Sequence, residues 1–182
     1  GKFLSHGRYS QDLLNRDVRD LQALYKDNGF EQAKVTSAVL DNYEGRENDL
    51  DVRISIEEGP QSKVLSLNIA GNQHIPEDQF PALNVVPGQP FSQAAIASDR
   101  DIVLNHYLNR GFPNATFEAS ASPPDEQNRI AVTYTVNEGD QVFVDRVIVS
   151  GLENTRPFVV QREIKMKPGD PLSQVKMLET QK

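Results

Sequence analysis

The 182-residue sequence contains no cysteine, which excludes disulfide bonds, thiolate metal sites and cysteine nucleophiles. Positive charge is also scarce, because 19 Lys and Arg residues stand against 26 Asp and Glu residues, giving a formal net charge of -7. Nucleic-acid binding needs a basic surface that displaces counterions, so this balance argues against that function. No apolar run approaches the roughly 18 residues of a membrane-spanning helix, and the richest stretch, 142–149, is interrupted by Asp145 and Arg146.

Motifs of common catalytic and metal sites are missing as well. No GxSxG, P-loop or GxGxxG sequence occurs. The histidines, at positions 6, 74 and 106, have no HxxxH or HExxH spacing, and we interpret them as surface residues. The acidic segment 41–49 departs from the EF-hand pattern, because Tyr43 takes a ligand position and no glycine stands sixth, so we interpret it as a hairpin loop. We expect no enzyme activity, no metal site and no cofactor.

What the sequence does contain is an internal repeat with a period of about 80 residues. Any single match is weak, but several occur in the same order along the chain. The matching pairs are YSQ at 9–11 with FSQ at 91–93 and LSQ at 172–174, PGQP at 87–90 with PGDP at 168–171, Gly29-Phe30 with Gly111-Phe112, EEG at 57–59 with NEG at 137–139, and NIAGN at 68–72 with IVSGL at 148–152.

The register of this repeat predicts three segments. Residues 61–140 correspond to one complete unit. Residues 1–60 correspond to the later part of a unit, with its second helix and last two strands. Residues 141–182 correspond to the earlier part of another, with its first strand, first helix and the start of its second helix. We therefore expect the sequence to be a fragment of a longer protein.

Within the complete unit, alternating apolar residues predict a first strand at 64–70. A turn at Gly71-Asn72 and a short helix near 75–78 follow. Ser92 is expected to cap a second helix whose apolar stripe ends at Gly111, followed by strands at about 114–121 and 129–136.

The first unit repeats the later part of this order. Ser10 is expected to cap a helix that ends at Gly29, and strands follow at about 31–40 and 50–57. Clean alternation in the last strand of each unit indicates that one face of the sheet contacts water. The order strand, helix, helix, strand, strand predicts an α+β module in which both helices pack on the apolar face of a small sheet.

This order, together with the strand-GN turn, the PGxPxS loop, the Y-x3-GF helix exit and the closing EG, resembles POTRA (polypeptide-transport-associated) domains. The resemblance covers nearly the whole chain, and the tandem arrangement resembles the periplasmic part of outer-membrane protein assembly factors of the BamA type. It implies tandem β-α-α-β-β modules, each with a three-stranded mixed sheet and two helices on one face.

The resemblance also implies a binding site, because in this family the second strand lies on an edge of the sheet to which substrate or partner segments are thought to add. An unpaired edge offers backbone N–H and C=O groups to any extended segment. We favour the first of the two edges, because Val35, Thr36, Val39 and Leu40 suit a pleated surface better than the Ala- and Ser-rich second edge. The candidate edge residues are Ala33, Lys34, Val35, Thr36, Ser37, Ala38, Val39 and Leu40 in the first unit, and Ala115, Thr116, Phe117, Glu118 and Ala119 in the second.

The connections between units are very short, which predicts hinge motion over a restricted range. The candidate hinge residues are Glu58, Gly59, Pro60, Glu138, Gly139 and Asp140.

As a function, the resemblance implies a periplasmic scaffold that binds unfolded outer-membrane proteins and accessory assembly lipoproteins, tethered to the outer membrane through a downstream β-barrel of the full-length chain. One alternative is the POTRA arm of a related transporter for two-partner secretion, autotransporter assembly or plastid protein import. Another is a purely structural spacer or self-assembly surface, in which incomplete units of two molecules complete each other.

Overall fold

The computed structural model describes residues 3–41, 50–150 and 164–180. The chain divides into two compact units, one made of Gly1–Ser66, Val85–Ala95 and Ser122–Ala131, the other of Leu67–Asn84, Ile96–Ala121 and Val132–Lys182. Among the described residues, no helix has the length and apolar character needed to cross a membrane.

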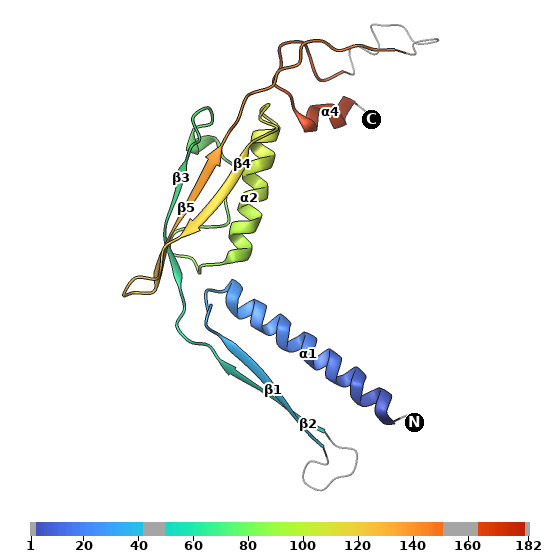
Figure 1. The fold of residues 1–182 in the computed structure, drawn as a ribbon, viewed down its shortest axis with the longest axis vertical. Coiled ribbons are helices and arrows are strands. Elements are labelled where there is room, and N and C mark those ends of the chain that lie inside the picture. The colour runs from blue at the N-terminus through green and yellow to red at the C-terminus, as the bar shows by residue number, and fades with distance from the viewer. Residues whose placement is uncertain (1–2, 42–49, 151–163, 181–182) are drawn as a thin grey trace. The chain divides into compact units, whose positions relative to one another are not determined.

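The chain begins with helix α1 (Phe3–Asp27), which packs on an antiparallel pair of strands, β1 (Lys34–Asp41) and β2 (Leu50–Glu57) (Figure 1). The expectation that Ser10 caps this helix is wrong, because α1 already begins at Phe3. The physical reason is a missing proline. Ser92 and Ser173 each follow a proline by two residues, and the residue before a proline avoids helical geometry, whereas no proline precedes Ser10.

Helix α2 (Gln93–Leu108) begins where the sequence predicts, and its cap is confirmed. The Ala95 backbone N–H donates to the Ser92 hydroxyl oxygen at 3.1 Å. Helix α4 (Gln174–Thr180) starts in the same way, with the Lys176 N–H donating to the hydroxyl oxygen of Ser173 at 3.4 Å. Two of the three YSQ-like motifs therefore mark helix starts.

The three-stranded sheet consists of β3 (Lys63–Ala70), β4 (Thr116–Ala121) and β5 (Arg129–Asn137), in the order β3-β5-β4. Strand β4 is antiparallel to β5, with Thr116 opposite Asn137. Strand β3 runs parallel to β5, since Lys63 at its start donates to the Asn128 carbonyl and Gly71 after its end lies against the Val136 carbonyl. The sheet is therefore mixed, and the α+β fold class expected from the sequence is confirmed. The first of the two expected helices is a single 3-10 turn, η2 (Glu77–Gln79).

A buried cluster between this sheet and α2 forms the core of the second compact unit. Its centre consists of Ile75, Val103, Tyr107, Phe112 and Val136. The cluster joins residues of the β3–η2 segment, α2 and the helix exit to Val136 of β5, so these three segments cover the same face of the sheet (Figure 1).

The matching strands β2 and β5 differ sharply in burial. On β5, the inward side chains Val132, Tyr134 and Val136 are buried, and Tyr134 is 0% exposed. The equivalent Ile54 on β2 is 42% exposed, and its neighbours Val52 and Ile56 are exposed as well. Residues 3–41 and 50–57 contain no counterpart of β3, which pairs with β5, or of the following segment, which contributes Ile75 to the core.

Asp99 of α2 holds a buried polar network together. The Asp99 side chain is 0% exposed, and its carboxylate accepts hydrogen bonds from the Tyr134 hydroxyl at 2.7 Å and from the Asn84 backbone N–H at 2.6 Å. Burial raises the pKa of Tyr134, and the hydrogen bond and charge of Asp99 raise that pKa further, so the hydroxyl stays protonated and donates. The network fixes α2 to β5 and to the segment after η2.

The last part of the chain forms little regular structure among the described residues. The strand expected before position 150 is not formed, and only an isolated bridge joins Phe143 to Pro171. Strand β3, by contrast, pairs with β5. The first helix expected in this segment falls within 151–163, outside the described residues.

Replacing Tyr134 with Phe tests the buried network. Tyr134→Phe removes one donor from a buried carboxylate, which should lower the free energy of unfolding by about 1–3 kcal/mol. Urea unfolding followed by circular dichroism measures the change. Thr135→Val, on the exposed face of the same strand, is the matched control, with an expected change below about 0.5 kcal/mol. Equal effects of the two substitutions would contradict the role assigned to Asp99.

Candidate functional site

Strand β1 pairs with β2 on one side only, so its other edge is open to further strand pairing. In an antiparallel pair, alternate residues direct their N–H and C=O groups away from the partner strand. The Val35 N–H donates to the side-chain Oε1 of Gln22 at 2.9 Å instead of to β2. Val35 is therefore an outward residue, and the register makes Ser37 and Val39 outward residues too.

Gln22 of α1 also donates through its Nε2 to the Ala33 carbonyl. Its carboxamide thus contacts the first outward C=O and N–H groups of the β1 edge. A surface groove of about 540 Å³ adjoins this contact, lined by Gln22, Lys26, Glu31, Gln32, Ala33, Lys34, Glu57 and Gly59.

Strand β4 is the corresponding edge of the three-stranded sheet. The Ser122 N–H donates to the Ala131 carbonyl, which assigns even-numbered residues to pairing with β5. The outward residues are therefore Phe117, Ala119 and Ala121. The Phe117 ring packs on Tyr134 with ring centroids 4.7 Å apart, so its side chain lies on the apolar face of the sheet.

The structure places the predicted edge residues on these two strands, apart from the first of each set. Residues 34–40 lie in β1 and residues 116–119 lie in β4, whereas Ala33 and Ala115 lie just before their strands. Alternation divides each set, because Thr36 and Ala38 direct their peptide groups to β2 and Glu118 directs its peptide groups to β5. Val39 and Leu40 have exposed side chains.

A repeated hydrogen-bonded contact follows each long helix. We call the first one joint 1, formed by Asn28, Gly29, Gln61 and Ser62. The Ser62 N–H donates to the Gly29 carbonyl at 2.8 Å, and the Gln61 side chain donates to the Asn28 carbonyl at 2.9 Å. Gly29 has a φ of +88°, and a Cβ on it would collide with the Ser62 carbonyl oxygen.

Joint 2 repeats this contact with Arg110, Gly111, Gln141 and Val142. The Val142 N–H donates to the Gly111 carbonyl at 2.6 Å, and the Gln141 side chain donates to the Arg110 carbonyl at 2.9 Å. Joint 1 lies within the first compact unit and joint 2 within the second. Sequence reasoning missed both joints, although Gln61 and Gln141 stand at equivalent positions of the repeat.

The predicted hinge residues lie just before these joints. Glu58, Gly59 and Pro60 are exposed and lead from β2 to joint 1. Gly139 and Asp140 are also exposed and lead to joint 2. Glu138 differs from the other hinge residues, because its side chain is buried.

Glu138 anchors the end of β5 to the loop that follows β3. Its carboxylate accepts hydrogen bonds from the Gln73 N–H at 2.8 Å and from the His74 N–H at 3.1 Å, and it contacts His74 Nδ1 at 3.2 Å. Burial acts to raise the pKa of Glu138, but the hydrogen bonds from His74 and Gln73 outweigh it and hold this pKa below its ordinary value.

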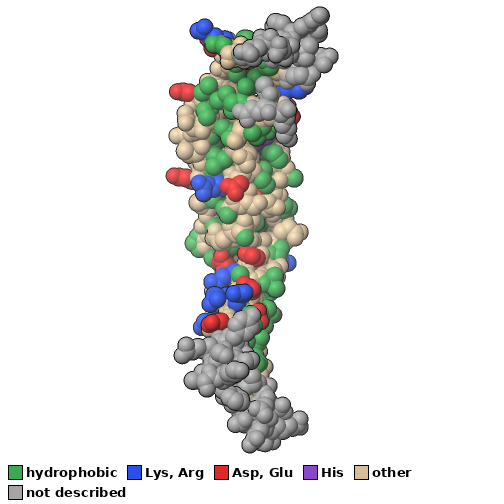
Figure 2. Space-filling view, turned by 90° about the vertical axis from the view of Figure 1, so that its right-hand side faces the viewer, with side chains coloured by type: hydrophobic (Ala, Val, Ile, Leu, Met, Phe, Trp, Pro, Cys, Tyr) green, Lys and Arg blue, Asp and Glu red, His purple; other side chains and the backbone are tan. Residues whose placement is uncertain are grey.

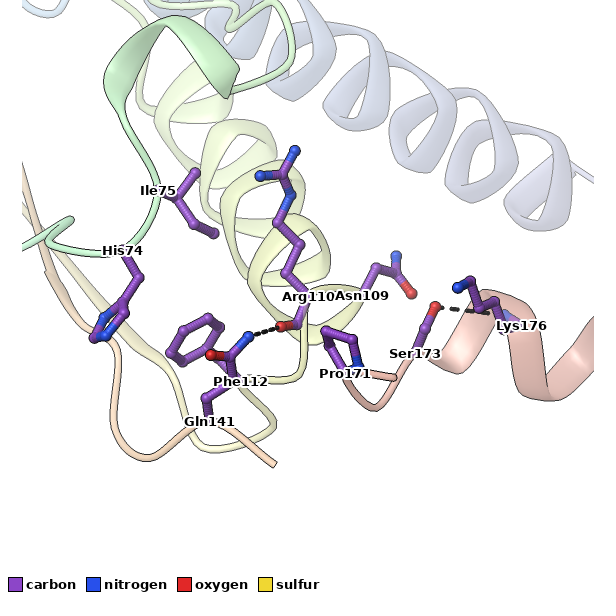
Figure 3. A pocket seen from close by; sticks show the side chains of 9 residues that line it. All are labelled: His74, Ile75, Asn109, Arg110, Phe112, Gln141, Pro171, Ser173 and Lys176. Atoms are coloured by element: carbon purple, nitrogen blue, oxygen red, sulfur yellow. Dashed lines mark hydrogen bonds between the residues drawn. The ribbon is translucent and has the colours of Figure 1, made fainter. Parts of the chain in front are cut away.

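A pocket of about 410 Å³ lies beside joint 2 (Figure 3). It is lined by His74, Ile75, Asn109, Arg110, Phe112, Gln141, Pro171, Ser173 and Lys176. Its basic side chains already contact other groups. Arg110 donates to the Gln79 side chain at 2.7 Å, and Lys176 lies 3.6 Å from Asp170. We therefore assign no ligand to this pocket.

Charged side chains of both signs are mixed on one face of the molecule (Figure 2). On the face drawn in Figure 2, acidic and basic side chains lie next to one another instead of forming a patch of one sign. Within the described ranges, no group of three His, Asp or Glu residues is placed to hold a metal ion.

Comparison with known proteins gives a consistent result. A family model named POTRA, described as "Surface antigen variable number repeat", matches residues 3–59 and 62–139, more than half of the chain. The chain is 26% identical over 182 residues to the outer membrane protein assembly factor BamA of Nitratidesulfovibrio vulgaris, covering 96% of this chain and 22% of that protein. Its identity with BamA of Buchnera aphidicola is 25% over 171 residues, covering 91% of this chain and 27% of that protein.

The chain thus spans about a quarter of the length of these curated relatives. Among solved structures, the crystal structure of Haemophilus influenzae BamA POTRA3-5 is similar in fold, with a TM-score of 0.51 and 19% sequence identity. That likeness covers 92% of this chain and 66% of the other.

Substitution of Gly29 tests joint 1. Gly29→Ala should lower the free energy of unfolding, because alanine is strained in the left-handed conformation. The collision with Ser62 should lower it by about 1–3 kcal/mol more. Gly88→Ala is a matched control, because Gly88 has a similar φ of +86° and open space around its Cβ position. Urea unfolding and exchange of the Ser62 amide hydrogen measure the difference. Joint 1 has no structural role if both variants lose the same stability and Ser62 stays protected.

The pH dependence of stability tests Glu138. At pH 7, Glu138→Gln should lower the free energy of unfolding by about 1–3 kcal/mol, because charge-assisted hydrogen bonds are lost. A lowered folded-state pKa stabilises the protein above the ordinary value of 4.5, and this contribution is lost as pH falls through the folded-state pKa. The free energies of unfolding of the parent protein and of Glu138→Gln should therefore become equal at low pH. Unfolding measurements from pH 7 to 3 test this.

Glu58→Gln provides the control for Glu138→Gln, because Glu58 is the exposed equivalent in the first copy. Its expected effect is below about 0.5 kcal/mol. A constant difference between Glu138→Gln and the parent protein at every pH would contradict the assignment.

Proposed function

The chain belongs to the POTRA family, and from this membership we propose that it acts as a periplasmic scaffold of an outer-membrane protein assembly factor, holding extended polypeptide segments at its sheet edges. The relatives named above are outer membrane protein assembly factors, which supports this choice over other POTRA-containing transporters.

The observation that carries the proposal is that β1 and β4 each have an unpaired edge. Each outward residue offers one N–H and one C=O to a guest strand, and such pairing depends little on the guest's side chains. This suits a scaffold that handles many clients. The exposed Val39 and Leu40 add apolar surface beside β1, so β1 is the favoured edge.

The proposed clients are unfolded outer-membrane proteins, whose extended segments would add to β1 or β4 as a further strand. Accessory assembly lipoproteins are proposed to use the same backbone groups. The chain would work in the periplasm, tethered to the outer membrane by a downstream membrane β-barrel of the full-length protein. None of these steps needs an enzymatic group, a metal ion or a cofactor.

The module boundaries belong to the same proposal. Segments 1–60, 61–140 and 141–182 would be one partial, one complete and one partial POTRA domain. Restricted motion at Glu58–Pro60 and at Glu138–Asp140 would adjust the domains to clients of different length. The buried Glu138 favours Gly139 and Asp140 as the more mobile part of the second connection.

Removing one outward N–H tests the edge. Proline at position 37 deletes an N–H that β2 does not use, so Ser37→Pro should abolish guest pairing on β1 while the β1–β2 pair persists. The matched control, Ser37→Ala, keeps the N–H and should bind normally. The measurement is the shift of backbone amide signals of the 182-residue chain with a soluble 12-residue peptide of alternating Thr and Val.

The same comparison applies to β4 with Ala119→Pro and Ala119→Ser. Each proline variant should lose peptide-induced shifts only on its own strand. Unchanged spectra of the parent chain at millimolar peptide would contradict the proposal and favour a structural spacer.

A further inference from the structure

The carboxamide of Gln22 occupies the first position at which a guest strand could pair with β1. Its Oε1 accepts from the Val35 N–H at 2.9 Å, and its Nε2 donates to the Ala33 carbonyl. We propose that Gln22 is a specificity-determining residue that sets the register of guest strands on β1. This inference rests on the proposed function, because it states which part of the same β1 edge is available to a guest strand.

The chemistry of the side chain explains why it acts as a stop. A primary amide presents a carbonyl acceptor and an N–H donor toward the same strand, so it satisfies the edge in the way that the N–H and C=O groups of one residue of a neighbouring strand do. A guest that displaced Gln22 would replace two existing hydrogen bonds with two new ones and gain no additional pair. It would also lose conformational entropy, so pairing at this position is unfavourable.

The surroundings strengthen the two hydrogen bonds. Ala33 is 2% exposed and Val35 is 8% exposed, and Gln22 itself is half-buried. Hydrogen bonds shielded from water in this way are stronger than exposed ones. The part of β1 left to a guest therefore starts after the Val35 N–H and includes the outward residues Ser37 and Val39.

The second copy of the module lacks this stop. The helix-exit tyrosines Tyr25 and Tyr107 align the two helices, which places Leu104 of α2 at the position of Gln22. Leucine has no hydrogen-bonding group, so it cannot cap the equivalent Ala115 carbonyl and Phe117 N–H. The two edges thus accept guests in registers that differ by one outward pair, which is two residues or about 7 Å along the strand.

A displacement of two residues preserves the alternation of side chains, since residues i and i+2 of a strand point to the same face. A guest with alternating apolar and polar residues can therefore pair with either edge in the same orientation. The stop shortens the pairing on β1 without turning the guest's apolar side chains toward water.

Amide hydrogen exchange of the unliganded 182-residue chain tests the cap itself. The Val35 amide should exchange about tenfold more slowly than in the Gln22→Leu variant, because the variant loses the hydrogen bond. Gln22→Leu reproduces the residue of the second copy, and a thermal unfolding curve verifies that it folds. The proposal is overturned if Val35 exchanges equally fast in both proteins.

Peptide binding tests the register. With the 12-residue Thr/Val peptide, the parent chain should show added protection at Ser37 and Val39 but none at Val35. Gln22→Leu should extend the added protection to Val35. On β4 the parent chain should show added protection at Phe117, and Leu104→Gln should remove that protection. Peptide protection of Val35 in the parent chain would overturn the register limit while leaving the proposed function in place. No protection on either edge would overturn both, whereas the cap would still be decided by the unliganded measurement.

Discussion

The glycine that ends each long helix is the constraint on which the rest of the structure depends. Gly29 and Gly111 adopt a left-handed conformation that reverses the chain after the helix and directs it into an edge strand. Each also accepts a hydrogen bond through its carbonyl from the segment that begins the following module. A side chain at either position would meet the backbone of that segment, so one residue controls the helix end, the start of the edge strand and the joint. The edges are therefore placed by the same contact that links consecutive copies.

The two candidate edges share a backbone but differ in what the neighbouring helix offers them. On β1, the amide of Gln22 occupies the first outward groups, whereas the aliphatic Leu104 stands at that place beside β4. The apolar faces behind the edges differ as well. Tyr134 on β5 is buried and hydrogen-bonded to Asp99, while the equivalent Ile54 on β2 is exposed. Equivalent positions in a repeat thus keep the fold while the chemistry at each edge varies.

The repeat and the alternation patterns predicted the element order, because period, turn residues and apolar spacing are local properties of the sequence. The Ser92 cap was predicted from the same signals. The prediction that Ser10 caps the first helix was wrong, because its motif lacks the preceding proline that keeps the helix from extending upstream. The hydrogen-bonding role of Gln22 could not be found in this way, and Glu138 was predicted only as a hinge residue. Their roles depend on contacts between residues far apart in sequence, such as Glu138 with Gln73, which no local pattern records. The edge residues came from the family resemblance, and only the strand register divides them into outward and inward sets.

The two parts of each joint, the helix-ending glycine and the later glutamine and strand start, lie in different copies of the repeat, and this affects how such proteins gain or lose modules. The helix-ending glycine of joint 1 is Gly29, and the glutamine and strand start that meet it are Gln61 and Ser62. One period later, Gly111, Gln141 and Val142 repeat the arrangement. Any stretch one period long therefore carries both parts of a joint, the helix-ending glycine whose carbonyl accepts the hydrogen bond and the strand start whose N–H donates it. An in-frame gene duplication or deletion of that length leaves matching parts on either side of the break, so copy number can change during evolution without inventing a new interface.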